Sequence, residues 1–342
     1  FRTNADECQI PSQVVPVLPE SDPRAEKEKE GKMNAALATG VKRLFAYNTR
    51  CLTALERHEV IRAEVHRLRK LRNMGFLQEA FPETPLPPQS KAEAAYENLI
   101  RLGVLGVGGF GKVELCEDKR SSRYYALKTL SKTFAYKTSM LPSLKMERLV
   151  LSTAYSPFVV SFYGSYNRSL TVSFLLEPLL GGDLYTIYSR HNLHGNVELA
   201  RYYMASVAMG VTHLHSLYII CRGVKPEDCC LDSNGHLKLV DMGFAKFVDS
   251  KTYTTCGTPD YLAPEIIKGS GHGPAVDWFA LGVMLFELLS GRSPFASGLP
   301  MQVYAKVMKG IRSVDFPSSI PHEAKSFILD VCAHEASDRL PM

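Results

Sequence analysis

The sequence lacks long apolar runs and lacks cysteines at metal-binding spacing. No apolar stretch approaches the roughly 20 residues that span a bilayer, so we expect no transmembrane segment. The 8 Cys are scattered apart from the neighbours Cys229 and Cys230, and none forms a C-x-x-C pair. We therefore expect no zinc, haem or flavin and no small disulfide scaffold. Reduced cysteines favour a cytoplasmic protein.

A strong charge of one sign is also missing. The formal net charge of +5 is mild, so composition alone indicates neither nucleic acid nor a membrane surface as partner. We find no internal repeat and no signal-peptide pattern. With 342 residues and 45% hydrophobic residues, the chain is long enough for one large or two ordinary globular domains.

The first part of the chain differs from the rest. Residues 1–32 are polar and rich in mixed charge, which predicts an extended arm that folds only against a partner. Residues 33–75 predict a long basic amphipathic helix, and residues 76–96 contain four prolines that predict a semi-stiff linker. The helix carries a mostly apolar seam at alternating spacings of three and four, formed by Leu44, Tyr47, Cys51, Ala54, His58, Ile61, Val65 and Leu68.

Three interpretations of this helix stay open. It docks on the following domain or on a neighbouring protein, it pairs in a coiled coil, or it binds nucleic acid through its basic end, Arg62 to Arg72. A solvated face and the attraction between cations and a helix C-terminus explain the same charge. We expect a protein partner for the arm and helix, and we favour nucleic acid least.

From residue 97 onward the periodicity changes. Short β-rich segments come first, and two long apolar-periodic stretches, Ala200–His215 and Val276–Leu289, predict helices after Gly182. This order predicts an α+β fold with a small β lobe (97–177), a larger helical lobe (178–342) and a cleft between them. The expected strands are Leu99–Leu105, Val113–Cys116, Tyr124–Lys128, Val159–Tyr163 and Val172–Leu176.

Two motifs in the β-rich part indicate phosphate binding. Glycines at 106, 108, 109 and 111 let backbone N–H groups approach phosphates closely. Lys128, in the apolar strand that follows, can cap phosphate oxygens, with Glu147 as its candidate partner. Each motif is weak alone, because glycine-rich turns are common and lysines often keep edge strands exposed.

Further motifs follow in a fixed order. Cys221–Asp228 has the sequence C-R-G-V-K-P-E-D, and D-M-G at 241–243, A-P-E at 263–265 and D-W-F-A-L-G at 277–282 come after it. This order resembles the signature set of protein kinases. The segment T-T-C-G-T-P-D-Y at 254–261 is similar to the activation segment of kinases dependent on cyclic AMP or cyclic GMP. The resemblance covers residues 97–342 and implies a bilobal kinase fold. The sequence stops soon after Arg339, and we expect no tail of the kind that wraps the small lobe in these kinases.

The resemblance implies a site for ATP and Mg²⁺. The glycine loop would cover the phosphates, Lys128 would hold them with Glu147, and Asp241 and Asp228 would hold metal. Glu177 to Leu179 would read the adenine edge, and Asp183 would meet the ribose. The cofactor-binding residues implied in this way are Gly106, Gly108, Gly111, Val113, Ala126, Lys128, Glu147, Glu177, Leu179, Asp183, Cys230 and Asp241.

The catalytic loop departs from the family pattern. The family has an aspartate where this chain has Gly223, and that aspartate accepts or orients the proton of the substrate hydroxyl. Glycine can do neither. Lys225 is retained, but the family asparagine is Asp228, and the family's aromatic residues at 221 and 242 are Cys221 and Met242.

Other parts of the family machinery are retained. Asp277 is placed to anchor Arg222, and Glu265 and Arg339 match a pair that ties the large lobe together. Thr254 matches the activation-loop phosphorylation site. Thr258 would lose its usual partner, the missing aspartate.

We therefore predict a pseudokinase that works by binding, as a scaffold or a structural or regulatory subunit. The second interpretation is an active or weakly active serine/threonine kinase that transfers the γ-phosphoryl group of ATP to a protein hydroxyl. A nucleic-acid-associated structural protein is the third.

Overall fold

The computed structural model describes residues 94–108 and 111–339, which belong to a compact unit, Pro85–Met342. The predicted arm and helix, and all but the last residues of the predicted linker, lie outside the described residues. Their predicted boundaries stay predictions.

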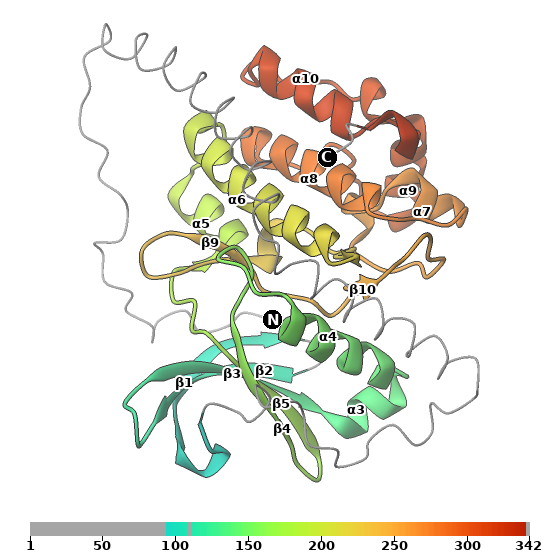
Figure 1. Cartoon of the computed structure of the whole chain (residues 1–342). Helices are drawn as coiled ribbons and strands as arrows, with labels where there is room; N and C mark the ends of the chain where they lie inside the picture. Colours follow the sequence, from blue (N-terminus) through green and yellow to red (C-terminus); the bar gives the residue numbers. More distant parts are fainter. Residues whose placement is uncertain (1–93, 109–110, 340–342) are drawn as a thin grey trace, which may run out of the picture. The chain divides into compact units, whose positions relative to one another are not determined.

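The first part of this unit is an antiparallel sheet (Figure 1). Its strand order is β1-β2-β3-β5-β4. The strands are β1 (Leu99–Gly108), β2 (Gly111–Asp118), β3 (Tyr124–Ser131), β4 (Phe162–Asn167) and β5 (Thr171–Leu176). The prediction for the fourth strand was wrong at its start. Val159 makes an isolated bridge with Leu239 instead, and the Val160 N–H donates to Leu239, so both valines are buried toward the helical lobe.

Two helices accompany this sheet. Ser131 caps α3 (Lys132–Lys137) by accepting from the Phe134 N–H. The next helix, α4 (Leu141–Thr153), begins with proline in its first turn, where the missing N–H costs nothing. Its buried residues include Glu147 and Leu151, so α4 contributes to both the site and the core.

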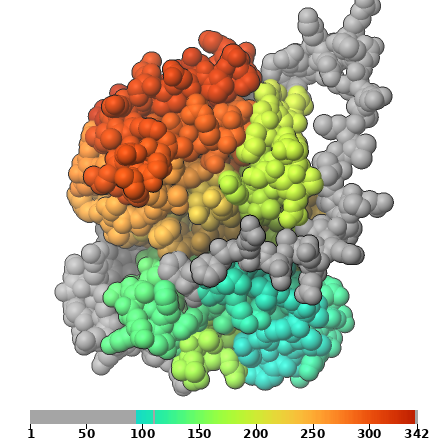
Figure 2. All heavy atoms as spheres, turned by 180° about the vertical axis from the view of Figure 1, so that it is seen from behind, coloured from blue at the N-terminus to red at the C-terminus, as the bar shows by residue number. Residues whose placement is uncertain are grey.

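The second part is mainly helical. Its helices are α5 (Leu184–His191), α6 (Val197–Ser216), α7 (Pro264–Lys268), α8 (Ala275–Ser290), α9 (Pro300–Lys309) and α10 (His322–Val331). Its short strands are β6 (Gly182–Asp183), β7 (Ile219–Ile220), β8 (Cys229–Leu231), β9 (Leu237–Leu239) and β10 (Lys246–Phe247). Short 3₁₀ turns lie at Tyr96–Asn98 (η3), Pro226–Asp228 (η4), Pro259–Tyr261 (η5), Ile311–Ser313 (η6) and Ala336–Asp338 (η7). The α+β fold with a β lobe and a helical lobe is confirmed (Figures 1 and 2).

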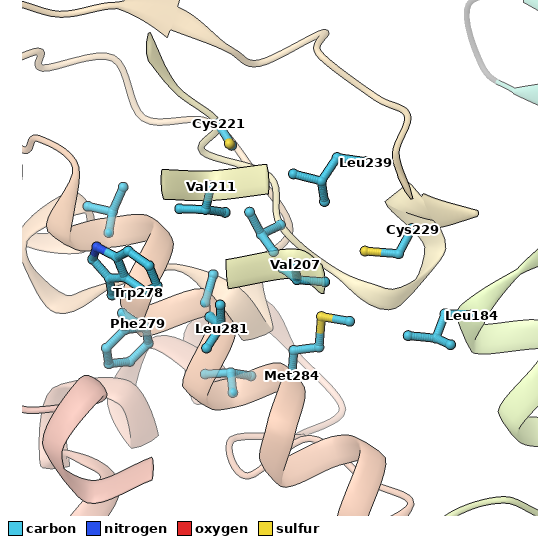
Figure 3. Close-up of a cluster of buried hydrophobic side chains, with 14 of the residues drawn as sticks. Leu184, Val207, Val211, Cys221, Cys229, Leu239, Trp278, Phe279, Leu281 and Met284 are labelled. Atoms are coloured by element: carbon cyan, nitrogen blue, oxygen red, sulfur yellow. The ribbon is translucent and has the colours of Figure 1, made fainter. Parts of the chain in front are cut away.

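The core of the helical lobe is built around α8. Nearly all of its residues are buried, as expected for a helix that is apolar on all sides. Figure 3 shows α8 side chains such as Leu281 and Met284 facing α6 residues Val207 and Val211, with Cys221 and Cys229 at the margin of the same cluster. The loop that begins at Cys221 therefore rests directly on the core. Within the described part of the chain, no helix is both long enough and apolar enough to cross a membrane.

Candidate functional site

The pairing of strands β1, β2 and β3 brings together the residues that are predicted to hold the phosphates. Val113 pairs with Gly106 on one side and with Lys128 on the other. A Cβ added at Gly106 would meet nothing within 4 Å, whereas one at Gly111 would lie 2.0 Å from the Thr129 carbonyl oxygen. Gly111 is therefore required for packing. Gly106 is not, so the space beside it is open to a ligand.

Lys128 forms the ion pair that the sequence predicted. Its Nζ lies 2.6 Å from a Glu147 carboxylate oxygen and 3.3 Å from one of Asp241. Burial alone would lower the pKa of Lys128, but the two carboxylates raise it above its ordinary value. The lysine is therefore charged, and it links α4 to the segment after β9.

The residues that are predicted to surround the adenine come from both lobes. Ala126 on β3 pairs with Leu176 on β5, and Cys230 on β8 pairs with Asp183 on β6. Between the two sheets runs the connection at Glu177–Leu179. No backbone partner of the Glu177 carbonyl or of the Leu179 N–H is found among residues 94–108 and 111–339, so these groups are free for the edge of a base.

Two of the carboxylates that are predicted to bind a nucleotide also have structural roles, which we did not predict from the sequence. Asp183 caps α5 by accepting from the Thr186 N–H at 2.8 Å and from its hydroxyl at 2.7 Å. The carboxylate of Glu177 accepts from the Ser161 N–H and pairs with Lys238 on β9. The D-x-x-T pattern at 183–186 is a recognisable cap signal. The pairing of Glu177 with Lys238 has no local signal, because it depends on tertiary structure.

The catalytic loop is held through its backbone. Asp277, fully buried on α8, accepts from the Cys221 N–H at 2.9 Å and from the Arg222 N–H at 2.8 Å. His215 also contacts this carboxylate at 2.7 Å. Arg222 has a left-handed backbone (φ 61°), which is uncommon for a residue with a side chain. Asp277 therefore sets the shape of the loop just before Gly223.

The guanidinium of Arg222 does not contact Asp277. It donates to the carbonyl oxygens of Phe244 at 2.9 Å and of Thr254 at 3.4 Å. Thr254 is exposed and receives this bond through its backbone, not its hydroxyl. Arg222 thus connects the catalytic loop to the start and the middle of the activation segment.

Gly223 leaves a gap in the loop. A Cβ built there would lie 3.3 Å from Cδ2 of Phe244 and 4.0 Å from Oδ2 of Asp228. A cavity of about 10 Å³, room for about one water molecule, lies beside Gly223, Thr258 and Asp277. No hydrogen bond of the Thr258 hydroxyl is found within the described ranges. The nearest carboxylate to the missing one is therefore Asp228.

Asp228 has an unusual environment. Burial and the neighbouring Asp241 raise its pKa to about 8, although Lys225 lies 4.0 Å away. The pKa of Asp241 is lowered instead, because Lys128 and the Gly243 N–H offset its burial. The two predicted metal ligands therefore differ in protonation at neutral pH, with Asp241 ionised and Asp228 protonated.

The site fits a nucleotide with a metal held partly by phosphate. Among the described residues, no group of three or more His, Cys, Asp or Glu residues could hold a metal ion alone. Magnesium commonly takes one or two carboxylates and completes its shell with phosphate oxygens and water. Asp241 and Asp228 would supply such carboxylates, with Lys128 beside the phosphates.

The residues that replace the family's aromatic rings are packed in the core. Leu151, Cys221, Met242 and the half-buried Phe162 belong to one hydrophobic cluster. Burial and the nearby Asp277 raise the pKa of the Cys221 thiol, so it stays protonated. Cys221 and Met242 are therefore both buried in the core, although neither carries a ring.

The end of the activation segment is tied to the helical lobe. Arg339, which is 3% exposed, donates to both carboxylate oxygens of Glu265 at 2.6 and 2.7 Å. Such two-pronged pairs are strong and geometrically specific. The retained pair thus fixes α7 against the segment that follows η7.

Comparison with known proteins agrees with this geometry. The Protein kinase domain family model matches residues 99–342. The chain is 36% identical over 255 residues to "cAMP-dependent protein kinase catalytic subunit" of Dictyostelium discoideum, covering 75% of this chain and 39% of that protein. It is 40% identical over 253 residues to "cGMP-dependent protein kinase egl-4" of Caenorhabditis briggsae, covering 73% of this chain and 34% of that protein. For human "cGMP-dependent protein kinase 2", the identity is 38% over 251 residues, covering 73% and 33%. The matched region therefore spans less than half of the length of these three relatives.

Proposed function

Because this chain belongs to the protein kinase family, and because it is similar to kinases dependent on cyclic AMP and cyclic GMP, we propose that it is a catalytically impaired member that works by binding. In this proposal it serves as a scaffold or a regulatory subunit. Its bilobal domain would present surfaces to a partner without transferring phosphate at a useful rate.

The observation that supports this proposal is Gly223. General base catalysis and positioning contribute about 10²- to 10⁴-fold to a rate, or about 3–5 kcal/mol of barrier. In this chain the position of the base has no side chain, and Asp228, the nearest carboxylate, matches a metal-binding position of the family pattern. Asp277 and Arg222, which hold the catalytic loop, are both retained.

The proposal predicts an inactive purified protein. We expect no transfer of the γ-phosphoryl group from ATP to a serine/threonine peptide above the level of a Lys128→Met variant, in the presence of Mg²⁺. The measurement is incorporation of labelled phosphate, with a melting curve of the variant to show that it is folded. Robust metal-dependent labelling by the unmodified chain, lost in Lys128→Met, would overturn the proposal.

Binding of ATP is a separate proposal. It rests on the open space at Gly106, the charged Lys128 and the free backbone groups of Glu177 and Leu179. A ligand that binds only the folded state stabilises it by mass action, by about 2.7 kcal/mol at a hundredfold excess over its Kd.

We therefore expect millimolar ATP to raise the melting temperature by several degrees, with about 2–4 °C per kcal/mol for a domain of this size. Thermal-shift titrations with and without Mg²⁺ measure this. Lys128→Met should reduce the shift, and Lys309→Met on α9 serves as a control. No shift in any condition would mean that the lobes are purely structural.

The second candidate is a serine/threonine kinase with residual activity. It is supported by the intact Lys128–Glu147 pair and by Asp228, whose Oδ2 lies 4.0 Å from the missing Cβ. A carboxyl with a pKa of about 8 is ionised in a minor fraction near neutral pH and in a larger fraction at pH 8, and that fraction could accept a proton. In this case Asp228→Asn would abolish the residual activity. Activity that comes from contaminating kinases would instead be the same in preparations of the wild type and of the variant.

Partner and location also remain proposals. We propose that the segment before residue 94 supplies the contacts to a protein partner, within a larger assembly, and that the protein acts in the cytoplasm. Pull-down of that partner by the full chain but not by residues 94–342 would support the first statement. Recovery of the same partner with both would contradict it.

A further inference from the structure

A groove of about 400 Å³ lies outside the predicted nucleotide site. It is formed by the base of the activation segment at Ser250 and Lys251, the α7–α8 connection at 270–275 and the α10–η7 connection at 334–337, together with two residues of α7. Its volume lies in the range of sites that hold small ligands or short peptide segments, about 300–1,000 Å³. Of the residues predicted for the kinase-like site, only Glu265 lines it.

The walls of this groove are fixed by close backbone approaches. Thr252 and His272 exchange two backbone hydrogen bonds of 2.9 and 2.8 Å. Gly271 has a φ of +84°, and a Cβ there would lie 2.7 Å from the Tyr253 ring and 3.3 Å from Cδ of Lys251. Only glycine permits the stem of Lys251 to cross the α7–α8 connection at this distance. The groove is therefore defined by packed segments.

Two lysines and two glutamates line the groove, and Arg339 behind Glu265 adds a third cation. Glu265 is neutralised by Arg339, and Glu335 lies 3.4 Å from Lys268 and 3.9 Å from His334. Lys251 is exposed, and no ion pair of Lys251 is found within the described part of the chain. Its ammonium group is thus free for an anion. The serine hydroxyls of 250 and 270 line the same groove.

His272 carries an unsatisfied buried nitrogen next to the groove. It is 3% exposed, and its Nε2 is buried without a hydrogen-bond partner among the described residues. Burial, together with Arg222, lowers its pKa, so the ring is neutral at pH 7. Buried polar atoms without partners are uncommon and call for an explanation. The ring belongs to the lining of the groove, but its Nε2 is closed off from solvent, so it meets a ligand only after neighbouring side chains shift.

We propose that this groove binds a phosphoryl group carried by a partner polypeptide. A phosphoserine or phosphothreonine presents nearly two negative charges and three acceptor oxygens. These match the Lys251 ammonium and the Ser250 hydroxyl on one segment, and the Ser270 hydroxyl, whose bond to the Glu265 carbonyl oxygen is long at 3.5 Å, on another. A carboxylate has fewer acceptors and less charge, so it satisfies this donor set less completely. The groove would let a phosphorylated partner engage the base of the activation segment.

The test is a calorimetric titration of the full chain with three peptides of one sequence, containing phosphoserine, serine or glutamate. We expect saturable binding of the phosphoserine peptide only, and competition by inorganic phosphate. Lys251→Glu should weaken that binding at least tenfold, since the change replaces a cation that would meet the phosphoryl group by a carboxylate that repels it. Lys251 is exposed, so this variant should fold.

Three controls separate this site from others. Lys309→Glu, at an exposed lysine on α9, should leave the affinity unchanged, which excludes a general charge effect. Lys128→Met should also leave it unchanged, which excludes binding of phosphate at the nucleotide site. Equal binding of the three peptides, or equal affinity of the wild type and Lys251→Glu, would overturn the proposal.

Discussion

Replacing Gly223 by aspartate is expected to raise the rate of phosphoryl transfer to a peptide by about 10²- to 10⁴-fold, the contribution of a positioned base. Gly223 has no positive φ, and a Cβ there contacts the Phe244 ring at 3.3 Å. The ring must therefore shift by a few tenths of an ångström, and the backbone need not change. Thr258 lies beside the same cavity and would regain an acceptor.

The measurement is initial rate with saturating ATP and Mg²⁺, compared with the wild type and with Gly223→Ala. Alanine adds the Cβ without the carboxylate, so it separates the acid from a change in loop rigidity. Addition of Lys128→Met to Gly223→Asp should return the rate to background. The introduced carboxylate would lie near the carboxyl of Asp228, and the two would repel each other when both are ionised. The double variant Gly223→Asp with Asp228→Asn should therefore be more active than Gly223→Asp alone. No rise in either would mean that further parts of the site are impaired, which favours a scaffold.

Asp228→Asn is expected to stabilise the protein at alkaline pH but not at acidic pH. The pKa of Asp228 is about 8 in the folded chain, against an ordinary value of 3.8. Between these values the folded state holds a proton that the unfolded state has lost. The free energy of unfolding of the wild type therefore falls as pH rises from about 4 to about 8, by up to ~1.4 kcal/mol per pH unit. Asparagine does not titrate, so the free energy of unfolding of the variant does not fall with pH for this reason.

Melting curves in a chelator at pH 5 and pH 8 test this. The two proteins should melt closer together at pH 5, and the variant should gain about 3–4 kcal/mol relative to the wild type by pH 8. Asp232→Asn is a matched control, because that carboxylate has a lowered pKa and lies in a different turn. A difference between Asp228→Asn and the wild type that does not change with pH would show that Asp228 is ionised throughout.

Much of the site followed from the sequence because the motifs are local and ordered. Lys128 and Glu147 lie 2.6 Å apart, and Glu265 meets Arg339, as their positions in the motifs indicated. The strands were predictable where alternation and β-branched residues coincide. The fourth strand was misplaced because Val159 and Val160 are as apolar as strand residues but are buried against β9 of the other lobe. Periodicity cannot distinguish these two kinds of burial.

The sequence did not predict features that are formed by residues from several segments. The high pKa of Asp228 results from burial and from Asp241, which is distant in the chain. The same is true of the groove at Lys251, whose walls come from three separate segments. No single stretch carries a signal for either. The left-handed backbone at Arg222 is equally hidden, since arginine gives no hint of positive φ.

The way in which Asp277 holds the loop has a consequence for the history of such a domain. The carboxylate fastens main-chain amides of the two residues that precede position 223, so the architecture of the turn does not depend on which side chain follows. Loss of a side chain at position 223 would therefore leave the described surfaces of the domain in their present form. A lineage that already relied on those surfaces for assembly would feel little selection to reverse it.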